Sequence, residues 1–250
     1  MTATTSTALP PGVYVPTKDE KSHQEAIPAP TPAPSWPQTP KMRLSVEDMA
    51  HPGAVRFFKH IQDINTFLES CVIAIFELLF SPNTAPTNVR SVTLILREMD
   101  GIAYTTGSRL DNDHKEIHFS LRHIAAIDVE RIGDDIKGVL QHELVHCFQC
   151  SGHGCPGGLI EGMADYVRLR RGFAPPYWKR SSEGKWDSGY ERTGYFLDWL
   201  DTTYPVDGNG GCVRRLNESM KDVYDEHIWT KLTGHSVDSL WGKYAKTMQG

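Results

Sequence analysis

The sequence lacks several features that would mark a membrane or nucleic-acid-binding protein. No apolar run reaches the roughly 18 residues that a membrane span requires. Lysine and arginine number 26 against 31 aspartates and glutamates, and this net charge of −5 argues against a nucleic-acid or anionic-membrane partner. The first residues, MTATTSTALPPGVYV, have neither the basic start nor the apolar core of a secretory signal. We therefore expect a chain that stays inside the cell.

Cysteine is also scarce, with five in 250 residues. The odd number leaves at least one thiol free unless it pairs between chains, and a chain of this length can bury a core without a disulfide scaffold. A local Cys150–Cys155 bridge is the weaker alternative, because this spacing could close a small loop. Cys147 is expected to be a small buried apolar residue.

Proline is concentrated at one end of the chain. Nine of the 16 prolines fall in the first 40 residues, and IPAPTPAPSWPQTP is an extended, low-complexity run. Such a segment buries too little apolar surface to offset its chain entropy. We predict a disordered, proline-rich tail over residues 1–41 and a single folded domain over residues 42–250.

Apolar periodicity predicts strands early in the domain and helices late. Alternating apolar residues predict strands over 91–98 and 115–124, with His118 on the exposed face of the second strand. This order favours an α+β fold over a doubly wound sheet. Helices are expected over residues 57–80, 134–150, 159–171 and 188–204, with two or three short ones after them.

The segment 134–150 contains His142, Glu143 and His146 in the pattern H-E-x-x-H. On a helix, the two histidines project from one face about one turn apart and can bind one ion of zinc size. Glu143 leans over the same site, where it can take a proton from water. The alternative is a surface helix with solvated histidines. The opposite side of the helix carries the apolar residues Ile136, Leu140, Leu144 and Phe148.

A catalytic zinc ion usually has three protein ligands, so a third residue must be found. Glu161 is our candidate, with Asp165 one turn later to accept the free ring N–H of a ligating histidine. The alternative for both is an ordinary charged helix surface. His153 is a rival third ligand, although it stands one place beyond the position used in H-E-x-x-H-x-x-G-x-x-H. His153 with Cys147, Cys150 and Cys155 could also form a second, structural metal site.

The stretch HELVHCFQCSGHGCPGGLIEGMADYVRLRRGFAPPYW, followed by GKWDSGYERTGYFLDWL, resembles the plant basic secretory protein family. These are zincin-like metallopeptidases of plants, bacteria and fungi. The resemblance implies a zincin-like domain with a small twisted mixed sheet, an active-site helix and a helical C-terminal part. It also implies a substrate lying along the sheet's edge strand, which would be Glu116–Ser120. This chain departs from the family in being acidic and in lacking the secretion signal that family members typically have.

These observations predict a zinc-dependent peptidase that acts on a peptide or protein. Glu143 would serve as the base, and Tyr190 in WDSGY as the hydrogen-bond donor to the oxyanion, although Tyr190 could equally be a packed aromatic. Trp178 and Trp186 are expected to pack in the core rather than wall a cleft. The rival functions are a non-catalytic, metal-containing binding or defence protein and a metal-dependent amidase acting on small molecules. Retention of Glu143 argues against the first, because a structural zinc site needs no such residue.

Overall fold

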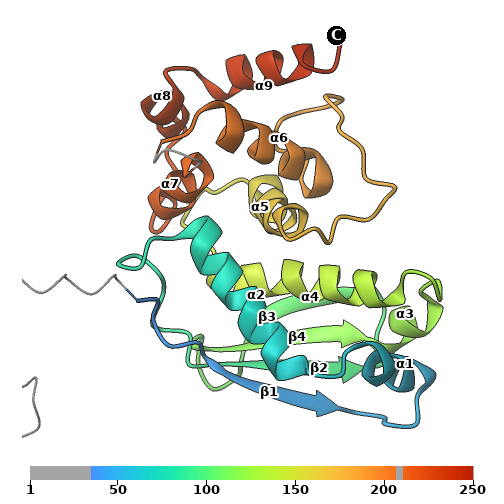
Figure 1. Ribbon diagram of the computed structural model, residues 1–250. Helices are drawn as coiled ribbons and strands as arrows, with labels where there is room; N and C mark the ends of the chain where they lie inside the picture. The colour runs from blue at the N-terminus through green and yellow to red at the C-terminus, as the bar shows by residue number, and fades with distance from the viewer. Residues whose placement is uncertain (1–34, 207–210, 250) are drawn as a thin grey trace, which may run out of the picture. The chain divides into compact units, whose positions relative to one another are not determined.

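The computed structural model describes residues 35–206 and 211–249, which contain four strands and nine helices (Figure 1). Strands occur only in the first half of this described part and helices dominate the second, so the predicted α+β class is confirmed. In chain order the elements are β1 (Lys41–Val46), α1 (Pro52–His60), α2 (Ile64–Leu79), β2 (Ser91–Arg97), β3 (Ala103–Gly107), β4 (His114–Ser120), α3 (Leu121–Ala126), α4 (Ile132–Phe148), α5 (Gly157–Arg170), α6 (Tyr190–Thr203), α7 (Cys212–Ser219), α8 (His227–Thr233) and α9 (Val237–Lys246).

The sheet is mixed, with the strand order β1-β2-β4-β3. β1, β2 and β4 run parallel, whereas β3 is antiparallel to β4. Side chains alternate along β2, where Val92, Leu94 and Leu96 are fully buried and the residues between them are half-buried. A strand that packs one face on a core shows this period of two. The predicted small mixed sheet is therefore confirmed.

The edge of the sheet is not the strand that the sequence indicated. Glu116–Ser120 was expected to be the edge, but it belongs to β4, which lies between β2 and β3. The edge strand next to β4 is β3, with the sequence AYTTG and no buried residue, and β1 forms the opposite edge. It was missed because its residues do not alternate between apolar and polar. The substrate-binding edge implied by the family resemblance therefore has to be moved by one strand.

His118 is buried rather than exposed, and β3 is again the reason. Only 8 % of its surface is accessible, because the ring of Tyr104 on β3 stacks on the imidazole at 4.5 Å and 8°. Glu116 lies on the same strand, with its carboxylate 3.3 Å from Nε2 of His118. The predicted exposure of His118 was wrong because it assumed a strand with an open outer face.

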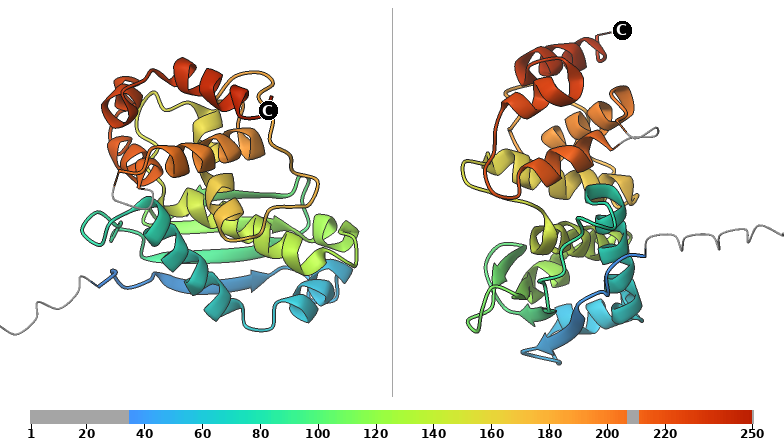
Figure 2. Two further views of the ribbon diagram at one scale, coloured as in Figure 1. Left: turned by 45° about the horizontal axis from the view of Figure 1, so that its top comes forward. Right: turned by 90° about the vertical axis from the view of Figure 1, so that its left-hand side faces the viewer.

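The helices form layers over the sheet. α2 and α4 cross one face of it, and α5 to α9 lie beyond α4, on the side away from the strands (Figure 1). Figure 2 shows the same order of layers from two further directions. α4 is consequently buried nearly all round, since its residues meet the sheet on one side and α5 on the other. No described helix has both the length and the apolar character needed to cross a membrane.

The helix predicted over residues 57–80 is in fact two helices. α1 ends at His60 and α2 begins at Ile64, with Asp63 as the N-cap residue whose carboxylate accepts the Thr66 N–H at 3.0 Å. Aspartate is a favoured N-cap because it satisfies a helix N–H that has no partner within the helix. Apolar residues on both sides of the break keep a helical spacing, and this hid the boundary.

Two other expectations concern the cysteines and the tail. All five cysteines are free thiols, so the alternative Cys150–Cys155 bridge is not formed, and Cys147 is buried as predicted. The tail predicted over residues 1–41 lies largely outside the described residues and stays a prediction, as does the single domain. Within the described part of that range, the Trp36 ring lies 6.0 Å from that of Phe76, and Lys41 begins β1.

Candidate metal centre

α4 brings His142 and His146 together in the interior of the molecule. Its apolar residues anchor it, and four-residue spacing then places both imidazoles on the side that faces α5. The two Nε2 atoms are 3.1 Å apart, and 8 % of His142 is accessible. Solvated surface histidines would not converge in this way, so the surface-helix alternative is excluded by the structure.

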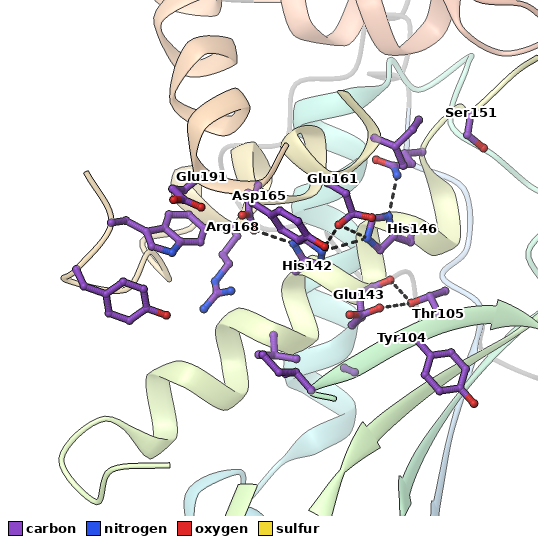
Figure 3. Close-up of a pocket in the computed structure, with 18 residues that line it drawn as sticks. Tyr104, Thr105, His142, Glu143, His146, Ser151, Glu161, Asp165, Arg168 and Glu191 are labelled. Carbon is purple, nitrogen blue, oxygen red and sulfur yellow. Dashed lines mark hydrogen bonds and ion pairs between the residues drawn. The ribbon is translucent and has the colours of Figure 1, made fainter. Parts of the chain in front are cut away.

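Glu161 on α5 closes the cluster. After α4 the chain reverses through a glycine-containing loop, and α5 packs across the histidine side of α4 (Figure 3). The Glu161 Oε2 atom lies 3.2 Å from Nε2 of His142 and 3.7 Å from Nε2 of His146. Ligand atoms about 2.0–2.1 Å from a tetrahedral zinc ion are about 3.3 Å from one another. The three side chains therefore could hold a metal ion.

His153, the rival third ligand, is placed elsewhere. It is exposed in the loop after α4, and its backbone forms a bridge with the segment before α8. Its N–H donates to the Asp222 carbonyl at 2.9 Å, and its carbonyl accepts from the Tyr224 N–H at 3.0 Å. Within the ranges that the structure describes, the only cluster with metal-binding geometry consists of His142, His146 and Glu161. The second, cysteine-containing metal site is therefore not formed.

Each histidine has a partner on its far nitrogen, which leaves Nε2 directed at the cluster. Nδ1 of His142 lies 2.7 Å from the buried Asp165 carboxylate, the pairing that the sequence suggested. Nδ1 of His146 lies 2.8 Å from the side-chain amide of Gln149. The Asp165 carboxylate accepts the proton on Nδ1 of His142 and so leaves Nε2 of that ring free to bind a metal, whereas the Gln149 contact orients the ring of His146. Gln149 was missed because a glutamine three residues after a histidine carries no specific sequence signal.

The electrostatics of the cluster favour a cation. Burial alone would lower the pKa of His142, but hydrogen bonds to Asp165 and Glu161 outweigh it and raise the pKa to about 9. The same contacts hold the pKa of Glu161 far below its usual range, chiefly through the His142 bond and next through His146. A site that stabilises a proton on a buried imidazole also stabilises a metal ion in its place. The residues present therefore fit a divalent metal.

Glu143 adjoins the cluster without belonging to it. The residue is 6 % accessible, and its carboxylate receives a hydrogen bond from the hydroxyl of Thr105 at 2.7 Å. The same hydroxyl lies 2.9 Å from the Glu143 backbone carbonyl. Thr105 belongs to the edge strand β3, so it links this carboxylate to the edge of the sheet (Figure 3). The sequence could not indicate Thr105, because β3 itself was not recognised.

A cavity of about 780 Å³ opens over these residues. Exposed side chains stand at its rim: Ile102 is 50 % accessible and Tyr104 is 43 % accessible. Trp178 lines the cavity, so its predicted core position was wrong, whereas Trp186 packs as expected, 5.2 Å from Trp229. The lining residues are Ile102, Ala103, Tyr104, Thr105, Val139, His142, Glu143, His146, Gln149, Ser151, Ile160, Glu161, Asp165, Arg168, Tyr177, Trp178, Tyr190 and Glu191.

Tyr190 reaches the cavity from the start of α6. Its backbone has a φ of 48°, an uncommon value for a residue other than glycine, and the preceding loop lies tightly against α5. A Cβ atom on Gly158 of α5 would fall 1.8 Å from the Asp187 carbonyl oxygen. The Tyr190 ring lies parallel to that of His142 at 6.2 Å, and 56 % of the residue is exposed. Tyr190 is thus not a packed core aromatic.

The fold and the site together define an α+β protein with a three-residue candidate metal centre at the floor of an open cavity. A family model described as "Peptidase of plants and bacteria" matches residues 39–244. The chain belongs to this family, the basic secretory protein family that its sequence resembles. Neither the comparison with curated proteins nor that with solved structures gave a match.

Proposed function

We propose that this chain is a zinc-dependent peptidase with His142, His146 and Glu161 as the metal ligands. The observation that carries the proposal is Glu143, a shielded carboxylate beside the cluster and at the floor of the cavity. A bound zinc ion would polarise the scissile carbonyl and lower the pKa of water toward neutrality. Glu143 then removes the proton as water attacks and delivers it to the leaving amine.

The unpaired edge of β3 supports the proposal that the substrate is a peptide. One side of β3 pairs with β4, and no other strand of the described chain pairs with its second side. An extended peptide can add to such a free edge through backbone hydrogen bonds. Residues 103–105 of this strand and the preceding Ile102 line the cavity, so a bound peptide would cross the cluster.

The two rival functions fit the site less well. A small-molecule amidase is expected to enclose its substrate, whereas this cavity has an exposed rim and extends along a strand. A protein that keeps a metal for structure alone needs neither the Glu143 carboxylate nor an open cavity beside the metal. Both observations favour the peptidase.

Metal removal tests the proposal. The purified protein is expected to contain about one zinc ion per chain and to hydrolyse casein. A chelator should abolish hydrolysis, because both the acidified water and the polarised carbonyl depend on the ion, and added zinc should restore it. Metal analysis by mass spectrometry and a fluorescent casein assay measure the two quantities. Hydrolysis that is unaffected by complete removal of the metal would contradict the mechanism.

Tyr190 is proposed as the hydrogen-bond donor to the oxyanion. The negative charge of Glu161 raises the pKa of the Tyr190 hydroxyl above its usual value, and burial makes a smaller contribution in the same direction. The hydroxyl therefore stays protonated and able to donate. Tyr190→Phe should lower kcat by roughly 10²- to 10³-fold and leave metal content unchanged. Tyr195→Phe is the matched control, because Tyr195 lies five residues further along α6 and does not line the cavity. Equal kcat values for the two variants would remove Tyr190 from the mechanism.

A further inference from the structure

The described cavity contains one basic side chain of the lysine or arginine type, Arg168. Arg168 lies on α5, one turn after Asp165, and its guanidinium projects into the cavity away from the metal ligands (Figure 3). The other charged lining residues, apart from the histidines, are all acidic: Glu143, Glu161, Asp165 and Glu191. Arg168 is therefore where this cavity can attract an anion independently of the metal.

Packing holds the guanidinium in a fixed position. Its Nε atom donates to the Phe173 carbonyl at 3.1 Å, and its central carbon lies 4.9 Å from the centre of the Trp178 ring. The guanidinium also lies against Gly138 of α4, because a Cβ atom added to that glycine would stand only 2.6 Å from Nε of Arg168. A guanidinium confined on three sides has already lost much of the conformational freedom that ligand binding would otherwise remove.

The remaining donors of Arg168 are free. Neither Nη1 nor Nη2 has a hydrogen-bond partner among the described residues, and no carboxylate there forms an ion pair with this side chain. Arg170, on the same helix, differs in pairing with both Asp198 and Asp201. Burial lowers the pKa of Arg168, and the nearby charge of Asp165 opposes this without contacting it. Arg168 is half-buried, and a charge that is partly withdrawn from water without a carboxylate partner is costly in the free protein.

We propose that Arg168 and Trp178 form a substrate-recognition subsite for a carboxylate. This inference rests on the proposed peptidase function and adds a substrate class to it. The two free Nη groups match the two oxygens of a carboxylate, and Trp178 covers one face of the guanidinium. The carboxylate belongs either to an aspartate or glutamate side chain or to the free C-terminus of the peptide. In the first case the subsite selects a sequence, and in the second it selects a chain end.

Four peptides of one neutral sequence distinguish these sources. The first has glutamine at a central position and an amidated C-terminus, and the second replaces that glutamine by glutamate. The third retains glutamine but has a free C-terminus, and the fourth carries lysine at the central position. Binding is measured by calorimetry on zinc-loaded protein carrying Glu143→Gln, so that no peptide is cleaved during the titration. The central residue is moved along the peptide in a series, so that every register relative to the subsite is sampled.

At least one carboxylate peptide is expected to bind roughly 10- to 100-fold more tightly than the neutral amide, as for hydrogen bonds to a charged group. Arg168→Gln should remove this difference, and Arg168→Lys should restore only part of it, because lysine keeps the charge but not the planar pair of donors. Lys179→Gln is the matched control, since it removes one positive charge from an exposed position next to Trp178 but outside the cavity lining. This control should retain the full difference.

Two results would overturn the subsite. One is equal affinity for the carboxylate and amide peptides, and the other is a difference that persists in Arg168→Gln. If Arg168→Gln fails to fold, Arg168→Lys decides instead, and an unchanged difference in that variant contradicts the bidentate contact. Casein hydrolysis by the wild type separates the two proposals. Hydrolysis without carboxylate discrimination overturns the subsite alone, whereas discrimination without hydrolysis overturns the peptidase assignment and retains the subsite.

Discussion

Replacing Glu143 by glutamine is expected to abolish peptide hydrolysis while leaving the metal in place. Glutamine has nearly the same shape and can still contact Thr105, but it cannot accept a proton from water. The loss of this step should lower kcat by roughly 10²- to 10⁴-fold, or about 3–5 kcal/mol of transition-state stabilisation. Glu143 is not one of the three residues whose ligand atoms converge, so the metal content should remain about one ion per chain.

The measurement pairs casein hydrolysis with metal analysis on the same sample. Glu130→Gln serves as the control, because it removes the same charge from an exposed residue outside the cavity lining. Near-normal hydrolysis by the Glu143 variant would show that another group activates water. Loss of the metal together with activity would instead make Glu143 a ligand, contrary to the geometry.

Replacing Glu161 by alanine should remove most of the metal affinity. The carboxylate is the third member of the cluster and offsets part of the charge of a divalent ion, so its loss removes both a ligand and a favourable charge. Asp165→Ala should weaken binding by about 10- to 100-fold, because Asp165 contacts the far nitrogen of His142 and not the ion's position. His153→Ala should leave the metal affinity nearly unchanged, since the His153 side chain is exposed in the loop after α4 and does not line the cavity.

Competition titration with a zinc-binding dye measures the three affinities. Circular dichroism of each metal-free variant checks that the fold is retained, which matters most for the buried Asp165. The expected order of loss is Glu161, then Asp165, then His153. If His153→Ala lost more affinity than Glu161→Ala, the assignment of the third ligand would be wrong.

Much of the candidate site could be predicted because its parts are local. The spacing of His142 and His146 fixes their common helix face, and Glu161 and Asp165 share a face of the next helix for the same reason. Only a short loop separates the two helices, so few arrangements can bring the two faces together. The order of strands and helices also followed from periodicity, whereas the mixed sheet was expected only from the resemblance to the family.

Several of the parts that the sequence did not reveal depend on β3. Its five residues are mainly polar or small, so no apolar alternation distinguishes the strand from a loop. The expected edge, the exposure of His118 and the partner of Glu143 were consequently wrong or absent. Arg168 was missed for a related reason: its position between α4 and the loop carrying Trp178 arises only in the folded chain.

The contact between Thr105 and Glu143 has a consequence for inhibitor design. A hydroxyl has one proton, so Thr105 can donate at one moment to either the carboxylate or the backbone carbonyl of Glu143, but not to both. The exact placement of the strand thus sets how this carboxylate is oriented. A compound that pairs with β3 and draws it outward would misalign the proposed base while leaving the three proposed metal ligands untouched. Selective inhibition would then need no chelating group, and its selectivity would come from the side chains of an edge strand.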